Sequence, residues 1–180
     1  MDRFWLAQYP PGTPTDIDIN RWPSIKALVE DSFQRFTDRT AFSQMGKAVS
    51  YGELDRLSAG FAAWLQDEGF KKGDRLAIML PNVLQYPVAI LGALRAGLVV
   101  VNCNPLYTAP ELEHQLNDSG ATAILVLENF ATTVQAVAPR TRLRTILITG
   151  AGDLLQFPRG LLVNFVLRHV KRAIPAWSLP

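Results

Sequence analysis

Residues 75–105 read RLAIMLPNVLQYPVAILGALRAGLVVVNCNP, and they place a helix-length segment between two short apolar runs. The first run, Arg75 to Leu80, is almost continuously apolar, which is typical of a strand that is covered on both faces. The segment after it ends at about Ala96, before Gly97, and tolerates Pro87 only in the first turn of a helix. A strand, a helix and a second strand in this order require a crossover, so the stretch predicts a parallel sheet.

The same alternation continues toward the C-terminus. Thr108 and Glu111 stand at the spacing of a capping box and predict the start of a helix, because the two side chains can satisfy free amide groups of its first turn. Strands are predicted at residues 122–127 and 145–149, with a short helix at about 129–138 between them. We therefore predict an α/β fold whose doubly wound, mainly parallel sheet carries helices on both faces.

A helix, a hairpin and a second helix are predicted before this sheet. Ser24 can cap the first helix, and the runs TAFSQ and KAVSY, separated by Met45 and Gly46, predict a small N-terminal hairpin. Ser50 and Glu53 repeat the capping-box spacing at the start of the second helix. The expected buried stripe of that helix consists of apolar residues at helical spacing: Leu54, Leu57, Phe61, Trp64 and Leu65.

Three regions follow from this pattern: an extended arm at residues 1–23, the α/β unit at 24–152 and a basic tail at 153–180. The tail predicts an amphipathic helix from about Gly160 to Ile174, and it has basic but no acidic residues after position 153. Such a helix can lie on a membrane surface or cover its own protein's core, and both interpretations stay open. The membrane interpretation would use Arg159, Phe165, Arg168, Lys171 and Arg172.

The composition argues against several classes of protein. The formal net charge is only +2, and basic residues alternate with acidic ones over most of the chain, which argues against nucleic-acid binding. Cys103 is the single cysteine, so no intramolecular disulfide can form, and we expect it to be a small buried residue. No secretory signal is recognisable, and no segment offers the roughly 18 apolar residues of a membrane span, so we expect a cytoplasmic protein.

Motifs for catalysis and ligand binding are weak throughout the chain. GAGDLL at residues 150–155 resembles the dinucleotide fingerprint, but Leu155 replaces its third glycine, so we interpret the stretch as a plain loop. One helical turn from His114 the sequence offers only Asp118 as a second ligand, which is too little for a metal site. We therefore predict no catalytic residue, no cofactor-binding residue and no metal site in this chain.

Polar residues gather where two predicted strands end. Pro81 and Asn82 follow the first strand of the opening stretch, and NCNPLYTAPELEHQL, residues 102–116, follows the second. Loops at the carboxyl ends of parallel strands converge on the crevice in which open α/β sheets bind ligands. Because this stretch offers no obvious catalyst, we expect it to frame a site.

Several short motifs together resemble the N-terminal region of adenylate-forming enzymes, the superfamily of acyl-CoA synthetases and luciferases. They follow the family's order at about its spacing: YGEL at 51–54, GDR at 73–75, LPN at 80–82, AG at 96–97, NPL at 104–106 and EL at 111–112. The arm and the tail are most similar to those of bacterial long-chain fatty-acid-CoA ligases. The resemblance therefore covers nearly the whole chain.

The resemblance implies an enzyme that uses ATP and magnesium to convert a fatty acid into an acyl-adenylate, releases pyrophosphate, and transfers the acyl group to coenzyme A. The family's phosphate loop, ribose-binding aspartate, magnesium-binding glutamate and adenylation lysine have no counterpart in this sequence. We therefore expect an N-terminal fragment that is inactive alone. The resemblance also implies which residues face the cleft shared with the rest of the enzyme: Pro81, Asn82, Asn102, Asn104, Pro105 and Tyr107.

The expected partners follow from these interpretations. Besides the remainder of its own enzyme, we expect a second copy of the chain, because a fragment leaves apolar surfaces and strand edges uncovered and can exchange its arm or tail. The membrane interpretation of the tail would place the protein peripherally on the inner membrane. Two alternatives remain open: a free-standing, non-enzymatic α/β module that binds a protein or a membrane, and a flavodoxin-like signalling or nucleotide domain.

Overall fold

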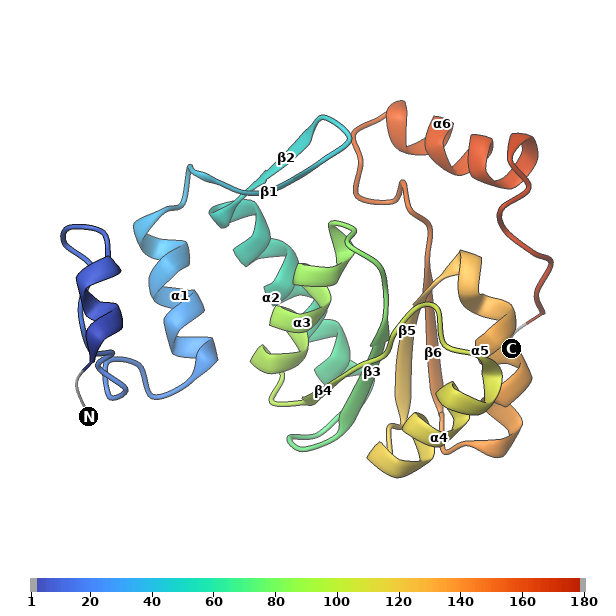
Figure 1. Ribbon diagram of the computed structural model, residues 1–180. Coiled ribbons are helices and arrows are strands. Elements are labelled where there is room, and N and C mark those ends of the chain that lie inside the picture. Colours follow the sequence, from blue (N-terminus) through green and yellow to red (C-terminus); the bar gives the residue numbers. More distant parts are fainter. Residues whose placement is uncertain (1–2, 179–180) are drawn as a thin grey trace.

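The central sheet has four parallel strands in the computed structural model, which describes residues 3–178. Their order is β4-β3-β5-β6, with bounds of Arg75–Met79 for β3, Val99–Asn102 for β4, Ala123–Leu127 for β5 and Thr145–Thr149 for β6. The central strand β3 pairs with β4 and β5, so that Leu76 lies between Val100 and Ala123. The parallel sheet that the sequence predicted is confirmed (Figure 1).

Helices cover both faces of this sheet, as the prediction of a doubly wound fold required. One face carries α2 (Tyr51–Asp67) and α3 (Gln85–Arg95), and the other carries α4 (Ala109–Ser119) and α5 (Ala131–Val137). Short 3₁₀ turns flank α5 on either side. Pro87 lies in the first turn of α3, the place that its missing amide proton allows.

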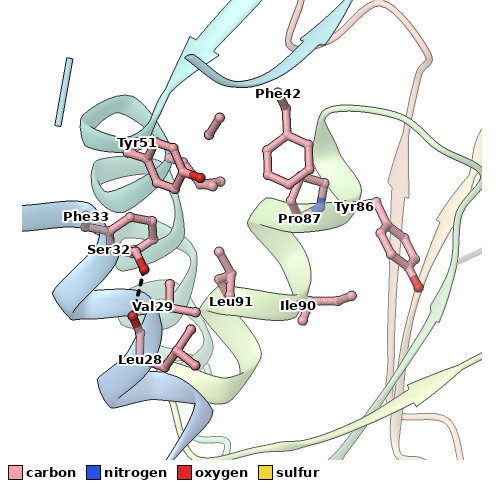
Figure 2. A pocket seen from close by; sticks show the side chains of 12 residues that line it. Leu28, Val29, Ser32, Phe33, Phe42, Tyr51, Tyr86, Pro87, Ile90 and Leu91 are labelled. Carbon is pink, nitrogen blue, oxygen red and sulfur yellow. Dashed lines mark hydrogen bonds between the residues drawn. The ribbon is translucent and has the colours of Figure 1, made fainter. Parts of the chain in front are cut away.

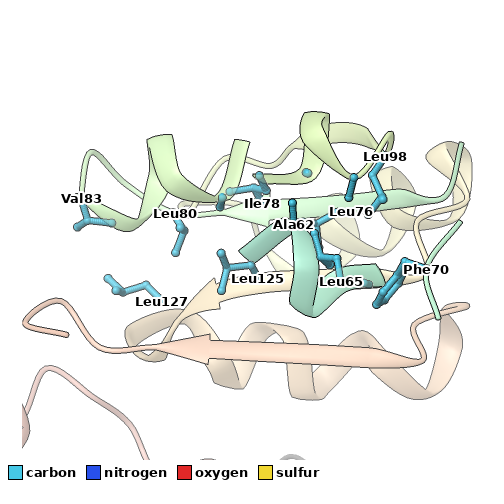
Figure 3. Packing of buried hydrophobic residues seen from close by; sticks show 14 residues of the cluster. Ala62, Leu65, Phe70, Leu76, Ile78, Leu80, Val83, Leu98, Leu125 and Leu127 are labelled. Carbon is cyan, nitrogen blue, oxygen red and sulfur yellow. The ribbon is translucent and has the colours of Figure 1, made fainter. Parts of the chain in front are cut away.

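Two apolar clusters fill the space between the sheet and its helices. Leu76 and Ile78 of β3 belong to the cluster under α2 and α3 (Figure 3), whereas Ala77 and Met79 belong to the cluster under α4 and α5. Successive side chains of a strand point to opposite faces of the sheet. One strand therefore serves both clusters, which explains why its sequence is apolar without interruption.

The two predicted capping boxes form in different ways. Glu111 accepts hydrogen bonds from the amide and the hydroxyl of Thr108, at 2.8 and 2.7 Å. Ser50 accepts one from the Glu53 amide at 3.1 Å, but the carboxylate of Glu53 binds Lys47 Nζ, at 2.9 and 3.0 Å. The predicted hydrogen bond from the Ser50 amide to the Glu53 carboxylate was wrong. The hairpin places the Lys47 ammonium beside the helix start, and a cation binds a carboxylate more strongly than a backbone amide does.

The predicted hairpin consists of β1 (Thr40–Gln44) and β2 (Lys47–Ser50), and it follows helix α1 (Ile25–Arg35). Ser24 caps α1 by accepting a hydrogen bond from the Ala27 amide at 3.1 Å. The cap that the sequence predicted is therefore present.

The N-terminal arm differs from the extended segment that was predicted. Phe4–Gln8 forms a 3₁₀ helix, η1, in which the rings of Phe4 and Trp5 pack edge to face with 5.4 Å between their centroids. Arg3 Nη1 lies 2.6 Å from Asp16 Oδ1 and ties the start of the arm to its middle. These local contacts fold the arm back on itself.

The tail helix is shorter than the predicted span to Ile174. Helix α6 covers Arg159–Phe165 and continues as a π-helical turn, η4, over Val166–Val170. The backbone leaves right-handed helical geometry at Arg172, whose φ is +47°, and this ends the helix before Ile174. In Figure 1, α6 lies beyond the ends of the sheet strands, close to the tip of the hairpin. Within residues 3–178, no helix is long and apolar enough to cross a membrane.

Candidate functional site

The six predicted cleft residues lie together at the carboxyl ends of β3 and β4. These strands pair in parallel, with Ile78 opposite Asn102, so the loops that leave them are neighbours. The three asparagines, Asn82, Asn102 and Asn104, are exposed. The other three residues, Pro81, Pro105 and Tyr107, are half-buried. The structure thus brings these residues to one edge of the sheet. That they face a cleft stays a prediction.

Hydrogen bonds hold the loop after β4 in shape. The Tyr86 hydroxyl donates to Asn102 Oδ1 at 3.1 Å, and Gln115 Nε2 donates to the Asn102 carbonyl at 2.9 Å. Asn104 Oδ1 accepts from the Leu106 amide at 3.0 Å, in the manner of an Asx turn. Both asparagine side chains therefore position the loop, while their exposure leaves capacity for further hydrogen bonds.

The strand order places the topological switch point between β3 and β5. After β3 the chain turns through α3 on one face, whereas after β5 it turns through α5 on the other. Ligands of open α/β sheets bind outside the carboxyl ends of the strands at such a point. The residues there are Asn82 after β3 and Glu128 with Asn129 after β5.

Glu128 is the functional candidate that the sequence interpretation missed. It is only 3% exposed, and its Oε2 lies 2.5 Å from Nη2 of Arg168 in the tail. Its other oxygen, Oε1, has no hydrogen-bond partner in the described protein. A buried carboxylate without a paired cation is costly, so Arg168 is its necessary partner. The signal that could have identified Glu128 is its place directly after the apolar strand AILVL, equivalent to that of Asn102 after VVV.

The tail lies over the same edge, where polar contacts hold it in addition to the apolar packing of Leu155 and Val163. Asn129 Nδ2 donates to the Ala173 carbonyl at 2.9 Å, beside the ion pair of Glu128 and Arg168. At the other end of the tail, Arg159 Nη1 donates to the Met45 carbonyl at the hairpin turn, at 2.7 Å. The tail therefore bridges the hairpin and the segment after β5.

The GAGDLL stretch, residues 150–155, forms a loop against which the tail helix α6 packs, in agreement with its interpretation as a loop. Asp153 Oδ2 accepts from the Gly150 amide at 2.7 Å, and Asn164 Oδ1 of α6 accepts from the Gly152 amide at 2.7 Å. The backbones approach closely here, since a Cβ atom on Gly152 would lie 2.3 Å from the Gly160 carbonyl oxygen. This contact explains the two glycines by packing and not by a bound nucleotide.

All five predicted membrane-surface residues are exposed, and two of them also bind protein groups. Arg159 and Arg168 bind protein groups through their guanidinium nitrogens, as described above. Phe165, Lys171 and Arg172 are exposed. Two of the five residues therefore hold the tail against the protein, and a membrane role for the set stays a prediction.

The remaining chemical groups give no catalytic constellation. Cys103 is buried, as predicted, and burial raises the pKa of its thiol to about 11. His114 and His169 are exposed on separate helical elements. Within the described range 3–178, no three His, Cys, Asp or Glu side chains gather as metal ligands do.

A separate apolar cavity of about 440 Å³ opens between α1, β1, α2 and α3. Figure 2 shows Leu28, Phe42 and Ile90 around it. Tyr86 also lines it, and the hydroxyl of this residue binds Asn102. Tyr86 therefore connects this cavity with the edge of the sheet.

Comparison with known proteins matches residues 29–161 to the family model of the AMP-binding enzyme. Over its whole length the chain is 49% identical to the long-chain-fatty-acid–CoA ligase of Escherichia coli O157:H7, of which it covers 32%. It is 37% identical to the long-chain-fatty-acid–CoA ligase of Bacillus subtilis over 88% of the chain and 28% of the relative. The chain thus spans about a third of the length of the curated relatives it matches.

Solved structures show the same fold. A long-chain-fatty-acid-CoA ligase from Archaeoglobus fulgidus superposes with a TM-score of 0.67 at 23% identity, over 87% of this chain and 32% of the other. The N-terminal domain of FACL13 from Mycobacterium tuberculosis gives a TM-score of 0.65, also at 23% identity, over 72% of this chain and 34% of the other. At these identities the likeness concerns the arrangement of the sheet and its helices.

Proposed function

This chain belongs to the AMP-binding enzyme family, and from that premise we propose that it forms the N-terminal part of a long-chain fatty-acid-CoA ligase. The observation that carries the proposal is the 49% identity to such a ligase, which extends through the arm and the tail as well as the α/β unit. In this role the complete enzyme joins ATP and a fatty acid to an acyl-adenylate, releases pyrophosphate, and passes the acyl group to coenzyme A.

The chain's own residues fit the edge of a substrate cleft and not a triphosphate site. The carboxyl edge offers the side-chain amides of Asn82, Asn102 and Asn104, which can donate and accept hydrogen bonds. Arg168, the cation described at the switch point, is already paired with Glu128. We therefore assign ATP, magnesium and coenzyme A to the part of the enzyme beyond this chain, and expect the chain alone to be inactive.

The residues at the carboxyl edge of the sheet would then position the loops that border the cleft. Tyr86 and Gln115 fix the loop after β4 through Asn102, and the neighbouring loop after β3 presents Asn82. An adjoining domain that closes on this edge would meet two preset loops whose exposed amides can hydrogen-bond to it. Such preorganisation reduces the ordering cost of closing a cleft.

A chimera tests the proposal. The matched third of the Escherichia coli ligase is replaced by this chain, and acyl-CoA formation is measured with a long-chain fatty acid. We expect activity within about tenfold of the parent, because close relatives keep the packing between their domains. The matched control is the chimera with Asn82→Ala and Asn102→Ala, which should lose at least about tenfold in activity while it unfolds at the same temperature.

A chimera that folds, as judged by a cooperative thermal transition, but forms no acyl-CoA would contradict the proposal. The free-standing binding module would then become the better interpretation. Activity of the isolated 180-residue chain in fatty-acid-dependent exchange of pyrophosphate into ATP would contradict the expectation of an inactive part.

We also propose that the isolated chain self-associates. Ile17 and Ile19 of the arm are exposed, and strands β4 and β6 are the outer strands of the described sheet. Apolar side chains and open strand edges of this kind favour contacts between copies. Light scattering at micromolar concentrations should give the mass of a dimer or larger, and a monomer at every concentration would refute it.

A further inference from the structure

The apolar cavity of about 440 Å³ is walled by the three helices α1, α2 and α3 and by strand β1. Leu28 and Val29 of α1 point toward α3 (Figure 2). Leu54 of α2 is buried, whereas Leu28 and Phe42 of β1 are 40% and 45% exposed. The cavity therefore reaches from solvent at Leu28 and Phe42 to the buried Leu54.

One arginine ties together the three helices that form the walls. Arg95 at the end of α3 forms ion pairs with Glu30 of α1 and Asp55 of α2. Its Nη1 also donates to Ser58 Oγ of α2 at 2.9 Å, and its guanidinium carbon lies 5.1 Å from the centre of the Phe33 ring of α1. The side chain of Arg95 is only 16% exposed, so water competes weakly for these contacts. The walls are thus fixed in place, which reduces the ordering cost of binding a ligand between them.

The lining of this cavity is uncharged. Among residues 3–178, no Lys, Arg, Asp or Glu side chain lines it, and its side-chain polar groups are three hydroxyls. The Ser32 hydroxyl already donates to the Leu28 carbonyl at 2.9 Å, and the Tyr86 hydroxyl donates to Asn102. A carboxylate would lose its hydration here and meet no cation. The lining therefore favours a neutral ligand over a fatty-acid anion.

A second cavity of about 230 Å³ adjoins the first and offers more polar groups. The residues that line both cavities are Phe42, Tyr86 and Pro87. The smaller cavity is also lined by Ser43, Gln44 and Asn82, whose hydroxyl and amide groups are neutral and can both donate and accept hydrogen bonds. An apolar space thus lies beside a neutral polar one.

We propose that the two cavities together bind a neutral amphiphile with a single hydrocarbon chain, such as a medium-chain alcohol. The chain lies in the larger cavity, and the hydroxyl group lies in the smaller one, within reach of Ser43 and Gln44. A volume of 440 Å³ is typical of small-molecule sites, which span about 300–1,000 Å³. This binding does not depend on the catalytic role proposed above.

Displacement of a fluorescent probe tests the proposal with the 180-residue chain. N-phenyl-1-naphthylamine is neutral and emits more strongly in apolar surroundings, so its emission reports occupancy of the larger cavity. The bound probe is then displaced by 1-decanol or by decanoate, which is ionised at about pH 8. We expect 1-decanol to displace it at a concentration at least about tenfold lower than decanoate does. Equal displacement, or tighter binding of decanoate, would overturn the proposal.

Three variants locate the ligand. Ile90→Trp fills the larger cavity and should weaken binding of the probe at least about tenfold. Leu28→Trp covers the exposed mouth and should act in the same direction, which keeps the test valid if the first variant does not fold. Ser43→Ala should weaken binding of 1-decanol about fivefold through the lost hydrogen bond and leave the probe unaffected.

The matched control adds the same indole group elsewhere. Leu106→Trp lies at a position that is 80% exposed, and it should bind the probe and 1-decanol like the unchanged chain. A cooperative thermal transition shows that each variant is folded. Folded Ile90 and Leu28 variants that bind as the Leu106 variant does would overturn the proposal.

The ligase chimera distinguishes a small ligand from protein as the occupant of the cavities. In a folded chimera, Ile90→Trp should remove the same amount of probe binding as in the isolated chain. If it removes binding only in the isolated chain, another part of the enzyme covers the cavities, and ligand binding is refuted. Acyl-CoA formation by the chimera is measured separately, so the two proposals can fail independently.

Discussion

The sheet core and the tail differ in how completely their helices bury apolar residues. Under the sheet, α4 buries Leu112 and Leu116 completely and leaves its polar residues to solvent. In the tail, α6 directs Asn164 toward the protein and leaves Leu162 to solvent. The comparison teaches that a hydrogen bond such as that of Asn164 can hold a helix against the protein beside half-buried apolar residues, here Val163 and Leu167, while other apolar residues stay in solvent.

The largest expected difference between the two regions is in stability. Leu76→Ala removes a fully buried side chain of β3 and should lower the free energy of unfolding by about 3 kcal/mol. Leu161→Ala removes an exposed side chain of α6 and should change it by less than about 0.5 kcal/mol. Urea unfolding followed by circular dichroism measures both, and equal losses would show that Leu161 is buried.

Gly152→Ala tests the close contact between the GAGDLL loop and helix α6. The added Cβ would lie 2.3 Å from the Gly160 carbonyl oxygen, so α6 must move away from the loop. We expect a loss of about 2 kcal/mol in the free energy of unfolding and faster proteolysis within the tail. Gly60→Ala is the matched control, because nothing lies within 4 Å of a Cβ there, and it should not destabilise the protein. Unchanged proteolysis of the Gly152 variant would contradict the close contact.

Arg168→Gln tests the ion pair over the switch point. It leaves the buried Glu128 without its cation, which should cost about 1 kcal/mol, a modest loss because solvent reaches half of Arg168 and screens the pair. Limited proteolysis should then cut the tail faster. The same change at Arg172 should have no effect on proteolysis, and equal effects of the two variants would argue against the pair.

The smallest effect concerns the thiol of the core. Burial raises the pKa of Cys103 from 9.0 to about 11, so the folded protein keeps the thiol protonated at pH 8. Because the folded-state pKa is the higher one, the associated stability is present below pH 9 and is lost as the pH rises toward 11. At pH 8 a thiol reagent should label the folded chain at least about tenfold more slowly than the urea-unfolded chain. Equal rates would place Cys103 at the surface.

Much of the core could be predicted because its signals are local. The apolar run from Arg75 to Leu80, the first-turn Pro87 and the cap at Thr108 each determine their own element through spacing and backbone geometry. Side chains of the second helix were less well predicted, since Ala62 and Ser58 are buried there while Trp64 is half-buried. Which small residues face the core depends on the neighbouring helix, and helical spacing alone does not specify that.

The orientation of the tail could not be predicted because its partners are distant in sequence. Arg168 meets Glu128 across 40 positions, and Arg159 meets Met45 across 114. The same distance explains why Glu128 was missed: a lone carboxylate after a strand acquires a role only when the fold supplies a cation. Polar residues after β3 and β4 were easier to recognise because parallel pairing alone brings them together.

The orientation of the tail is tested most directly by cysteine labelling at two adjacent positions. In a Cys103→Ser background, Leu162→Cys places a thiol on the outer face and Val163→Cys places one on the inner face. Maleimide labelling of the folded chain should be several times faster at position 162 than at position 163. Equal rates, or faster labelling at position 163, would contradict an outward apolar face.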